Sequence, residues 1–203
     1  MSDLAQRHAL VLGSASPRRR ELLEQLGVRF SLLPSHVDEP PPAGEAPEAY
    51  ARGLAERKAG ASAALLPPEQ RDAFVLGADT IVVIDERVLN KPDDDDEAQR
   101  MLLALQGRTH AVITAVCLRG DATGFARTIA VSSRVTFRAL DAAAAARYVA
   151  SGEGRDKAGS YAVQGLGAGL VRAIDGSYSN VVGLPACETL DLLLEAGVLQ
   201  AWP

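Results

Sequence analysis

A carboxylate interrupts one of the most apolar runs of the chain. Asp79 lies in Gly77-Ala-Asp-Thr, between strand-like segments at residues 73–78 and 80–84. An isolated carboxylate in an apolar strand is costly unless it is paired or coordinated, so Asp79 is a candidate metal ligand or general base. The alternative is that Asp79 caps a turn.

A second carboxylate follows another expected strand, which comes earlier in the chain. Glu39, with Asp38 before it, comes after a strand-like segment at residues 29–35 and could reach the same edge of the sheet as Asp79. A hard cation such as Mg²⁺ is bound by one or two carboxylates together with substrate phosphates. The pair is therefore a candidate site for a divalent cation.

Hydroxyls and cations are concentrated at an expected helix start. The segment Ser14-Ala-Ser-Pro-Arg-Arg-Arg follows a strand-like run at residues 8–13, with Ser16 able to cap a helix and Pro17 suited to its first turn. Three arginines there oppose the helix dipole unless an anion lies among them. The segment favours a polyphosphate site, and a solvated basic helix start is the alternative.

Two lysines and an acidic run carry weaker signals. Lys58 falls on an expected helix at residues 50–65, and Lys91 lies in Leu89-Asn-Lys-Pro; by themselves they indicate little. Carboxylates at residues 93–96 are typical of helix capping. The chain contains neither a Walker sequence nor Gly-x-Gly-x-x-Gly after a strand, which excludes a P-loop and an ordinary dinucleotide fold.

Histidines and cysteines lack the spacing of a metal site or a disulfide framework. We expect His8, His36 and His110 at strand ends or on the surface without a role, and Cys117 and Cys187 as small buried residues. No histidine is placed to form a nucleophilic triad with a serine of the helix start.

Composition limits the class of protein. The 203 residues carry 21 Lys and Arg against 26 Asp and Glu, a net charge of −5, which argues against general nucleic-acid binding. Apolar residues make up 47%, as in a globular domain, and no apolar run is long enough for a membrane span. The N-terminus lacks an apolar leader, and we expect a cytoplasmic protein with no membrane partner.

The elements that must position these residues alternate between strand and helix. Besides the segments above, a long hairpin is expected at residues 109–140 with a turn at 120–124. Helices are expected after residues 93–96, around residue 148 and after Pro185. The pattern predicts an α/β fold with a mixed sheet, in one domain or two closely joined lobes.

Several motifs occur together in one order along nearly the whole chain, from about residue 9 to residue 195. They are Ser14-Ala-Ser-Pro-Arg-Arg, Val37-Asp-Glu, Ala55-Glu-Arg-Lys-Ala, Gly77-Ala-Asp-Thr-Ile-Val-Val, Lys91-Pro, Lys157-Ala-Gly-Ser-Tyr-Ala-Val-Gln-Gly and Gly176-Ser-Tyr-Ser-Asn-Val-Val-Gly-Leu-Pro. With these motifs the chain resembles the Maf family of nucleoside triphosphate pyrophosphatases.

The resemblance implies a fold and a reaction. The fold would be an inosine triphosphate pyrophosphatase-like (Maf/Ham1) α/β fold, with an elongated mixed β-sheet flanked by helices and two lobes around a cleft, formed by one domain over residues 1–203. The reaction would be hydrolysis of a nucleoside triphosphate to the monophosphate and diphosphate, with Mg²⁺ or Mn²⁺ as cofactor. A local cationic pocket can bind a triphosphate on an otherwise negative protein.

The resemblance also implies roles for individual residues. Asp79 would be the proton acceptor and, with Glu39, would hold the metal. The cations that would bind phosphates are Arg18, Arg19, Lys58 and Lys91, and Ser14 and Ser16 would belong to the same loop.

Three positions resemble the dTTP/UTP branch of the family. The sister branch, acting on 7-methyl-GTP, usually has Trp, Gln and Glu where this chain has Arg18, Thr80 and Gln164. The amide of Gln164 can donate and accept hydrogen bonds, as suits the imide edge of uracil or thymine. The alternatives left open are 7-methyl-GTP hydrolysis, a nucleotide-binding regulator of septum formation, and a homodimer.

One position departs from the family pattern. Gly13 stands before Ser14 where family members commonly have Ala. We expect this change to keep the chemistry of the phosphate loop and to loosen the loop slightly.

Overall fold

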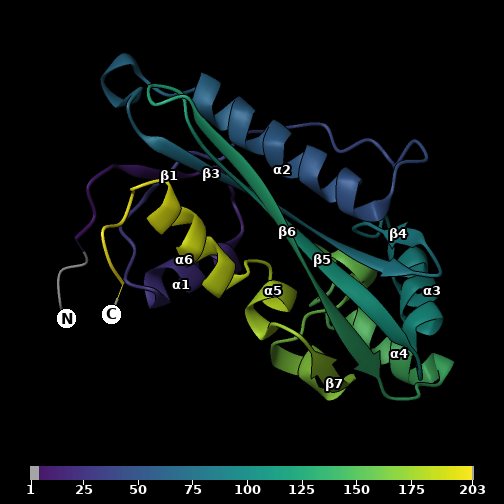
Figure 1. Cartoon of the computed structure of the whole chain (residues 1–203). Helices are drawn as coiled ribbons and strands as arrows, with labels where there is room; N and C mark the ends of the chain where they lie inside the picture. The colour runs from purple at the N-terminus through teal and green to yellow at the C-terminus, as the bar shows by residue number, and fades with distance from the viewer. Residues whose placement is uncertain (1–4, 203) are drawn as a thin grey trace. The chain divides into compact units, whose positions relative to one another are not determined.

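A computed structural model gives the fold for residues 5–202. In this range seven strands pair in the order β2-β1-β3-β5-β6-β7, with β4 paired to β3 (Figure 1). The strands are β1 Leu10–Leu12, β2 Ser31–Leu32, β3 Phe74–Ile84, β4 Arg87–Leu89, β5 Thr109–Gly120, β6 Phe125–Phe137 and β7 Val171–Asp175. The β1–β2 and β1–β3 pairs are parallel whereas β3–β4 and β6–β7 are antiparallel, which confirms the expected mixed sheet.

Six α-helices accompany these strands within the described range. They are α1 Pro17–Gln25, α2 Pro47–Ala64, α3 Asp95–Leu105, α4 Ala142–Ala150, α5 Tyr178–Val182 and α6 Ala186–Glu195. No helix among residues 5–202 combines the length and apolar character needed to cross a membrane.

The described residues form two compact units. The first unit comprises the described residues up to Asp79, together with Thr114–Val131 and the chain from Gly183 onward. The second unit comprises Thr80–Ile113 and Ser132–Val182. Strands β3, β5 and β6 contribute residues to both units. The expectation of one domain over residues 1–203 stays a prediction.

Alternation along the strands of the first unit directs side chains to two helical layers. Leu10 and Leu12 of β1 are buried in a cluster that also contains Leu23 of α1 and Leu193 of α6. Val11, between them, belongs to a different cluster, against which Ala63 of α2 packs. Successive strand residues point to opposite faces, so α1 and α6 cover one face of this part of the sheet and α2 covers the other (Figure 1).

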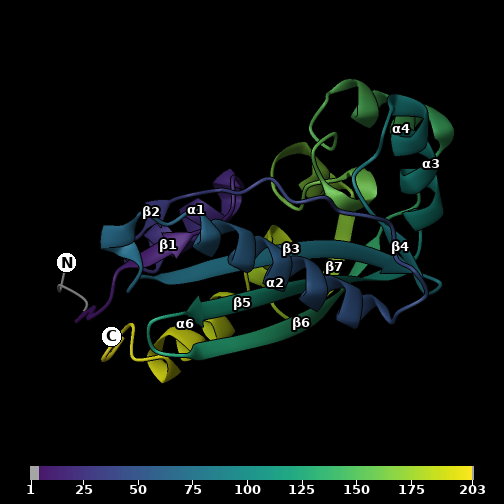
Figure 2. The same cartoon turned by 90° about the horizontal axis from the view of Figure 1, so that it is seen from above.

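The second unit has its own core. Strand residues such as Val82 and Phe137 pack with Leu102 of α3 and Val149 of α4. The two helices lie side by side in both views (Figures 1 and 2). Asp94 caps α3 by accepting a hydrogen bond from the backbone of Glu97 at 2.7 Å, which confirms the capping interpretation of the acidic run.

The sequence predicted most elements correctly but misjudged some details. Strand β3 is continuous through Asp79, so this residue does not cap a turn. The side chain of Ser16, at the N-cap position of α1, makes no capping hydrogen bond. Strand β2 has only two residues, and the short helix α5 was not expected. The turn at Asp85 and Glu86 is confirmed, and both residues have positive φ, at 49° and 62°.

One prediction of burial was wrong, because Cys187 is exposed, whereas Cys117 is buried as expected. His110 lies near the start of β5, one of the positions expected for it, and is only 3% exposed because it packs edge-to-face against Phe137 and Tyr161. The aromatic residues that enclose His110 are distant in sequence, so spacing alone could not place it in a core.

Candidate active site

One ammonium group joins the two predicted catalytic carboxylates. Lys58 Nζ lies 2.6 Å from Asp79 Oδ1 and 2.7 Å from Glu39 Oε1. Lys58 comes from α2, Asp79 from the middle of β3, and Glu39 from the connection that precedes α2. All three belong to the first unit. The structure therefore brings together three residues that lie up to 40 positions apart in the sequence.

A glycine allows α2 to approach β3 closely enough for this contact. A Cβ atom added to Gly77 would lie 2.5 Å from the backbone nitrogen of Ala59 and 2.6 Å from the carbonyl oxygen of Ala55. Both atoms belong to the turn of α2 that carries Lys58. Gly77 thus sets the distance between the helix and the strand, and the motif Gly77-Ala-Asp combines a close approach with a carboxylate two residues later.

Burial and neighbouring charges shift the pKa of Asp79 in opposite directions. Desolvation raises the pKa of this carboxyl above its ordinary value, whereas the charges of Lys58 and Arg19 lower it. Glu39 adds a smaller upward effect on the same pKa. A carboxylate with a raised pKa is a better proton acceptor, and the nearby cations still favour its ionised form.

Arg19 is a buried cation that contacts the loop before α1. Its Nη1 donates to Ser14 Oγ at 2.9 Å, and its Nε donates to the carbonyl oxygen of Gly183 at 2.8 Å. Burial lowers the pKa of Arg19, and the charges of Asp79 and Glu39 oppose this effect. A guanidinium remains charged under these conditions, so Arg19 places a fixed positive charge beside the two carboxylates.

The other arginines of the loop have different surroundings. Arg18 is half-buried, whereas Arg20 is exposed and donates to Glu24 one helical turn later, at 2.7 Å. Ser14 Oγ accepts a hydrogen bond from the backbone nitrogen of Ser16 at 3.3 Å. The loop is therefore ordered by Ser14 rather than by the expected cap from Ser16.

Gly13, where the family commonly has Ala, lies close to Ser62 of α2. A Cβ atom on Gly13 would lie 2.5 Å from Oγ of Ser62, a fully buried residue of α2. Ser62 Oγ in turn lies 3.2 Å from Ser35 Oγ. The space that a methyl group on residue 13 would need is occupied by a hydroxyl. The expectation that glycine loosens this loop stays a prediction.

Three predicted residues belong to the second unit. Thr80 follows Asp79 in β3, Lys91 is exposed just after β4, and Gln164 is exposed at the end of the motif that starts at Lys157. The backbone nitrogen of Gly159 donates to the carbonyl oxygen of Asn90 at 3.1 Å. This bond connects the segment that carries Gln164 with the segment that carries Lys91.

Sequence reasoning missed two residues of the last motif that take part in buried hydrogen bonds. Gly183 accepts a hydrogen bond from Arg19. Asn180, fully buried, donates from Nδ2 to the carbonyl oxygen of Val112 at 3.0 Å and to Ser133 Oγ at 2.9 Å. Both Asn180 and Gly183 lie in the motif Gly176-Ser-Tyr-Ser-Asn-Val-Val-Gly-Leu-Pro. The motif was visible in the sequence, but its hydrogen-bonding partners lie far away along the chain.

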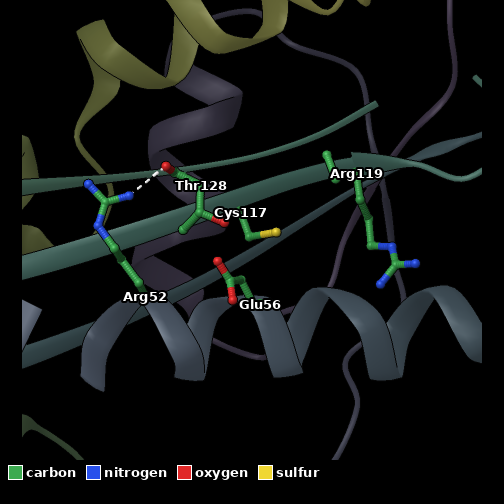
Figure 3. Close-up of a pocket in the computed structure, with 6 residues that line it drawn as sticks. Arg52, Glu56, Cys117, Arg119 and Thr128 are labelled. Carbon is green, nitrogen blue, oxygen red and sulfur yellow. Dashed lines mark hydrogen bonds between the residues drawn. The ribbon is translucent and has the colours of Figure 1, made fainter. Parts of the chain in front are cut away.

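A separate hollow of about 330 Å³ lies between α2 and the β5–β6 hairpin (Figure 3). Arg52 donates to the carbonyl oxygen of Thr128 at 2.6 Å and to Glu48 at 2.9 Å, and Arg119 donates to Asp121 at 2.8 Å. Each guanidinium is thus already bound to a carboxylate. The two arginines consequently do not form a second anion site.

The donor set around Asp79 suits a hard cation. Carboxylate oxygens of Asp79 and Glu39 both lie within 2.7 Å of the Lys58 Nζ, so the ammonium holds the point that they share and a divalent cation would bind to them beside it. Magnesium binds to one or two carboxylates and completes its coordination with water and substrate phosphates. Among residues 5–202, no three His, Cys, Asp or Glu side chains gather as a metal site. The protein's share of a cation site here would be these two carboxylates.

Comparison with known proteins identifies the family. The family model described as Maf-like protein matches residues 9–196, and the chain belongs to this family. A dTTP/UTP pyrophosphatase of Myxococcus xanthus (strain DK1622) is 50% identical over 198 residues, covering 98% of this chain and 97% of the relative. A dTTP/UTP pyrophosphatase of Pelotomaculum thermopropionicum (strain DSM 13744 / JCM 10971 / SI) is 46% identical and covers 93% of this chain and 96% of its own.

A solved structure supports the fold. The Ham1 protein of Staphylococcus aureus matches with a TM-score of 0.53 and 13% identity, over 93% of this chain and 98% of that protein. At this identity the likeness concerns the fold alone. It confirms the expected Maf/Ham1 architecture.

Proposed function

We propose that this chain hydrolyses dTTP and UTP to the nucleoside monophosphate and diphosphate. The observation that carries the proposal is the cluster in which Lys58 Nζ contacts both Asp79 and Glu39. Two carboxylates and a buried arginine around one ammonium provide a base and cations in one place, as cleavage of a polyphosphate requires. Relatives named dTTP/UTP pyrophosphatase support the choice of nucleotide.

In the proposed reaction Asp79 accepts a proton from a water molecule. The water oxygen forms a bond to the α-phosphorus, and the bond from that phosphorus to the bridging oxygen of the β-phosphate breaks, so that diphosphate leaves. The raised pKa of Asp79 favours the proton transfer. Lys58 holds the carboxylate in place through its 2.6 Å contact.

The cations of the site bind the phosphates. Arg19, fixed by Ser14 and Gly183, presents a charge that needs no reorganisation when the substrate arrives. Arg18 and Ser16 of the same loop, and Lys91, complete the proposed set of phosphate ligands. Asp79 and Glu39 would hold a divalent cation, Mg²⁺ or Mn²⁺, which when bound would neutralise charge on the phosphate oxygens.

Reading of the base edge is assigned to Gln164 of the second unit. Gln164 offers one amide donor and one amide acceptor, matching the alternating N–H and C=O groups of the uracil or thymine edge. Thr80, adjacent to Asp79 in β3, and Arg18 are the other positions at which the two branches differ. A cytoplasmic location, where nucleoside triphosphates are abundant, fits the proposed activity.

Diphosphate release from a nucleotide panel tests the proposal. We expect turnover with Mg²⁺ or Mn²⁺ to be confined mainly to dTTP and UTP among dTTP, UTP, CTP, GTP and 7-methyl-GTP. Asp79→Asn should lower kcat by at least about 100-fold, the typical contribution of a general base. Asp85→Asn is the matched control, because it neutralises an exposed aspartate paired with Arg108.

Each contrary result has a defined meaning. Preference for 7-methyl-GTP would overturn the assignment of base recognition and keep the chemistry of Asp79. Full activity in Asp79→Asn would remove this residue from the role of base. A wild-type protein that binds nucleotides without turnover would favour a regulator.

A further inference from the structure

The carboxylate of Glu153 holds the loop that carries Gln164. Glu153 Oε1 accepts a hydrogen bond from the backbone nitrogen of Leu166 at 2.8 Å, and Oε2 accepts one from the backbone nitrogen of Gly167 at 2.7 Å. The hydroxyl of Tyr148, from α4, donates to the same Oε2 at 2.7 Å. One side chain therefore satisfies three donors, two of which lie just beyond Gln164.

The other side of Gln164 is held through the same tyrosine. The backbone nitrogen of Ala162 donates to the hydroxyl oxygen of Tyr148 at 3.1 Å. The backbone is thus fixed two residues before Gln164 and again two and three residues after it. Gln164 itself remains exposed between these anchors. We call this arrangement of Glu153 and Tyr148 the Glu153 clamp.

Two glycines of the loop leave the space that the Glu153 clamp needs. Gly165 has φ of +64°, and a Cβ atom there would collide with Glu153 Oε1. A Cβ atom on Gly167 would collide with the carbonyl oxygen of Ala162 and lie 2.8 Å from the Tyr148 hydroxyl. Only glycine at these two positions lets the carboxylate and the hydroxyl approach the backbone so closely.

The charge state of Glu153 supports the same arrangement. Desolvation opposes ionisation, but the hydrogen bonds from Tyr148, Gly167 and Leu166 outweigh it and lower the pKa of the Glu153 carboxyl. An ionised carboxylate makes shorter and stronger hydrogen bonds than a neutral acceptor does. At neutral pH the Glu153 carboxylate is therefore ionised and accepts these three hydrogen bonds.

We propose that Glu153 is a positioning residue for base recognition, which fixes the backbone of residues 162–167 so that the Gln164 amide meets the pyrimidine edge. This inference rests on the proposed function, because it requires Gln164 to read the base. A pair of hydrogen bonds to the base tolerates little displacement of the amide, so a rigid loop lowers the cost of forming them. Glu153 acts through Gln164 and contacts no substrate in this scheme.

The first test is Glu153→Gln. The substitution keeps size and one acceptor oxygen, but its NH₂ group cannot accept from a backbone nitrogen. We expect KM for dTTP and UTP to rise about tenfold with kcat changed less than about twofold, because binding of the base and not the chemistry is affected. Glu97→Gln is the matched control, since Glu97 Oε2 also accepts from a backbone nitrogen, that of Asp93, at 2.7 Å.

A double-mutant cycle with Gln164→Ala shows whether the clamp acts through this amide. We expect Gln164→Ala to raise KM, and Glu153→Gln to add little in that background. Equal effects of Glu153→Gln in both backgrounds would overturn the clamp alone. A wild-type enzyme without pyrimidine triphosphate turnover would instead overturn the proposed function and the base-reading role with it.

Amide hydrogen exchange provides a readout that does not depend on activity. Glu153→Gln should accelerate exchange at Leu166 and Gly167 about tenfold or more, whereas Glu97→Gln should leave both amides unchanged. Unchanged exchange at these two amides in Glu153→Gln would show that the carboxylate does not hold the loop. That result would overturn the inference whatever the kinetics.

Discussion

At the scale of single residues, the site is a balance between burial and charge. Asp79 is 5% exposed in the middle of a strand, an environment that disfavours its ionised form. Lys58 contacts it directly, and Arg19 acts on it electrostatically. In the proposed reaction, the same groups that compensate its charge would bind the phosphates of the substrate.

Removing the ammonium should therefore change the pH dependence of the reaction. In the proposed reaction turnover requires ionised Asp79, so activity should fall as the pH drops through the pKa of this carboxyl. The charge of Lys58 lowers that pKa, and its loss in Lys58→Met should move the acidic limb of kcat/KM upward by about one pH unit or more. Lys58→Arg keeps the positive charge and should leave the limb close to that of the wild type. An unmoved limb in Lys58→Met would show that this limb reports another group.

How far single residues could be predicted follows from the same physics. A charged residue in an apolar run is unfavourable to bury unless it has a partner, and this argument identified Asp79 from the sequence. The role of Gly183 depends on the carbonyl oxygen that Arg19 reaches across 164 positions, which no local pattern contains. The overlap that a Cβ atom on residue 13 would have with Ser62 likewise depends on how α2 packs. Such pairings are decided by tertiary structure.

At the scale of elements, the site depends on the distance between α2 and β3. Gly77 faces the backbone of Ala55 and Ala59, so helix and strand touch without an intervening side chain. Hydrophobic periodicity predicted both elements correctly, because each buries an apolar face. Periodicity does not reveal the distance between elements, and the close approach at Gly77 becomes visible only in the folded chain.

Gly77→Ala should separate the two elements. The added methyl group would collide with backbone atoms, which cannot rotate away, so we expect a loss of about 3 kcal/mol in the free energy of unfolding. Activity should fall further than stability requires, because Lys58 moves away from Asp79. Denaturant unfolding and kcat measured below the unfolding transition separate the two effects.

Gly53→Ala is the control for that substitution. Gly53 lies in the same helix, and the nearest atom to an added Cβ would be Arg57 Nη1 at 3.8 Å. Alanine there should stabilise the helix by up to about 1 kcal/mol and leave kcat unchanged. Equal behaviour of the two variants would mean that Gly77 does not set the distance between α2 and β3.

At the scale of the whole molecule, stability couples to pH through a buried imidazole. His110 Nε2 is hydrogen-bonded to the Tyr161 hydroxyl at 2.8 Å, and the ring packs against Phe137. Burial lowers the pKa of His110 to about 4 from an ordinary value of 6.5. The folded protein therefore keeps this ring neutral at pH values where the unfolded chain protonates it.

The sign of the effect on stability follows from proton binding. Between pH 6.5 and about 4 the unfolded state binds the extra proton, so His110 contributes stability at pH 7 that is lost as the pH falls through this window. The full loss amounts to about 3 kcal/mol, since one pKa unit corresponds to about 1.4 kcal/mol. Asp79 opposes this trend, because an acid with a raised pKa stabilises the fold as the pH decreases.

Replacing the imidazole should remove this pH dependence. His110→Gln keeps a polar group for the Tyr161 hydroxyl but cannot titrate, so its free energy of unfolding should vary less than that of the wild type between pH 7 and 4. Denaturant titrations at several pH values measure the difference, with His36→Gln, at an exposed position, as the control. If the free energy of unfolding changed with pH in the same way in wild type and His110→Gln, the ring would be hydrated or protonated in the folded protein. We expect the free energies of unfolding of wild type and His110→Gln to differ less at pH 4 than at pH 7, because only the wild type loses the contribution of the neutral ring.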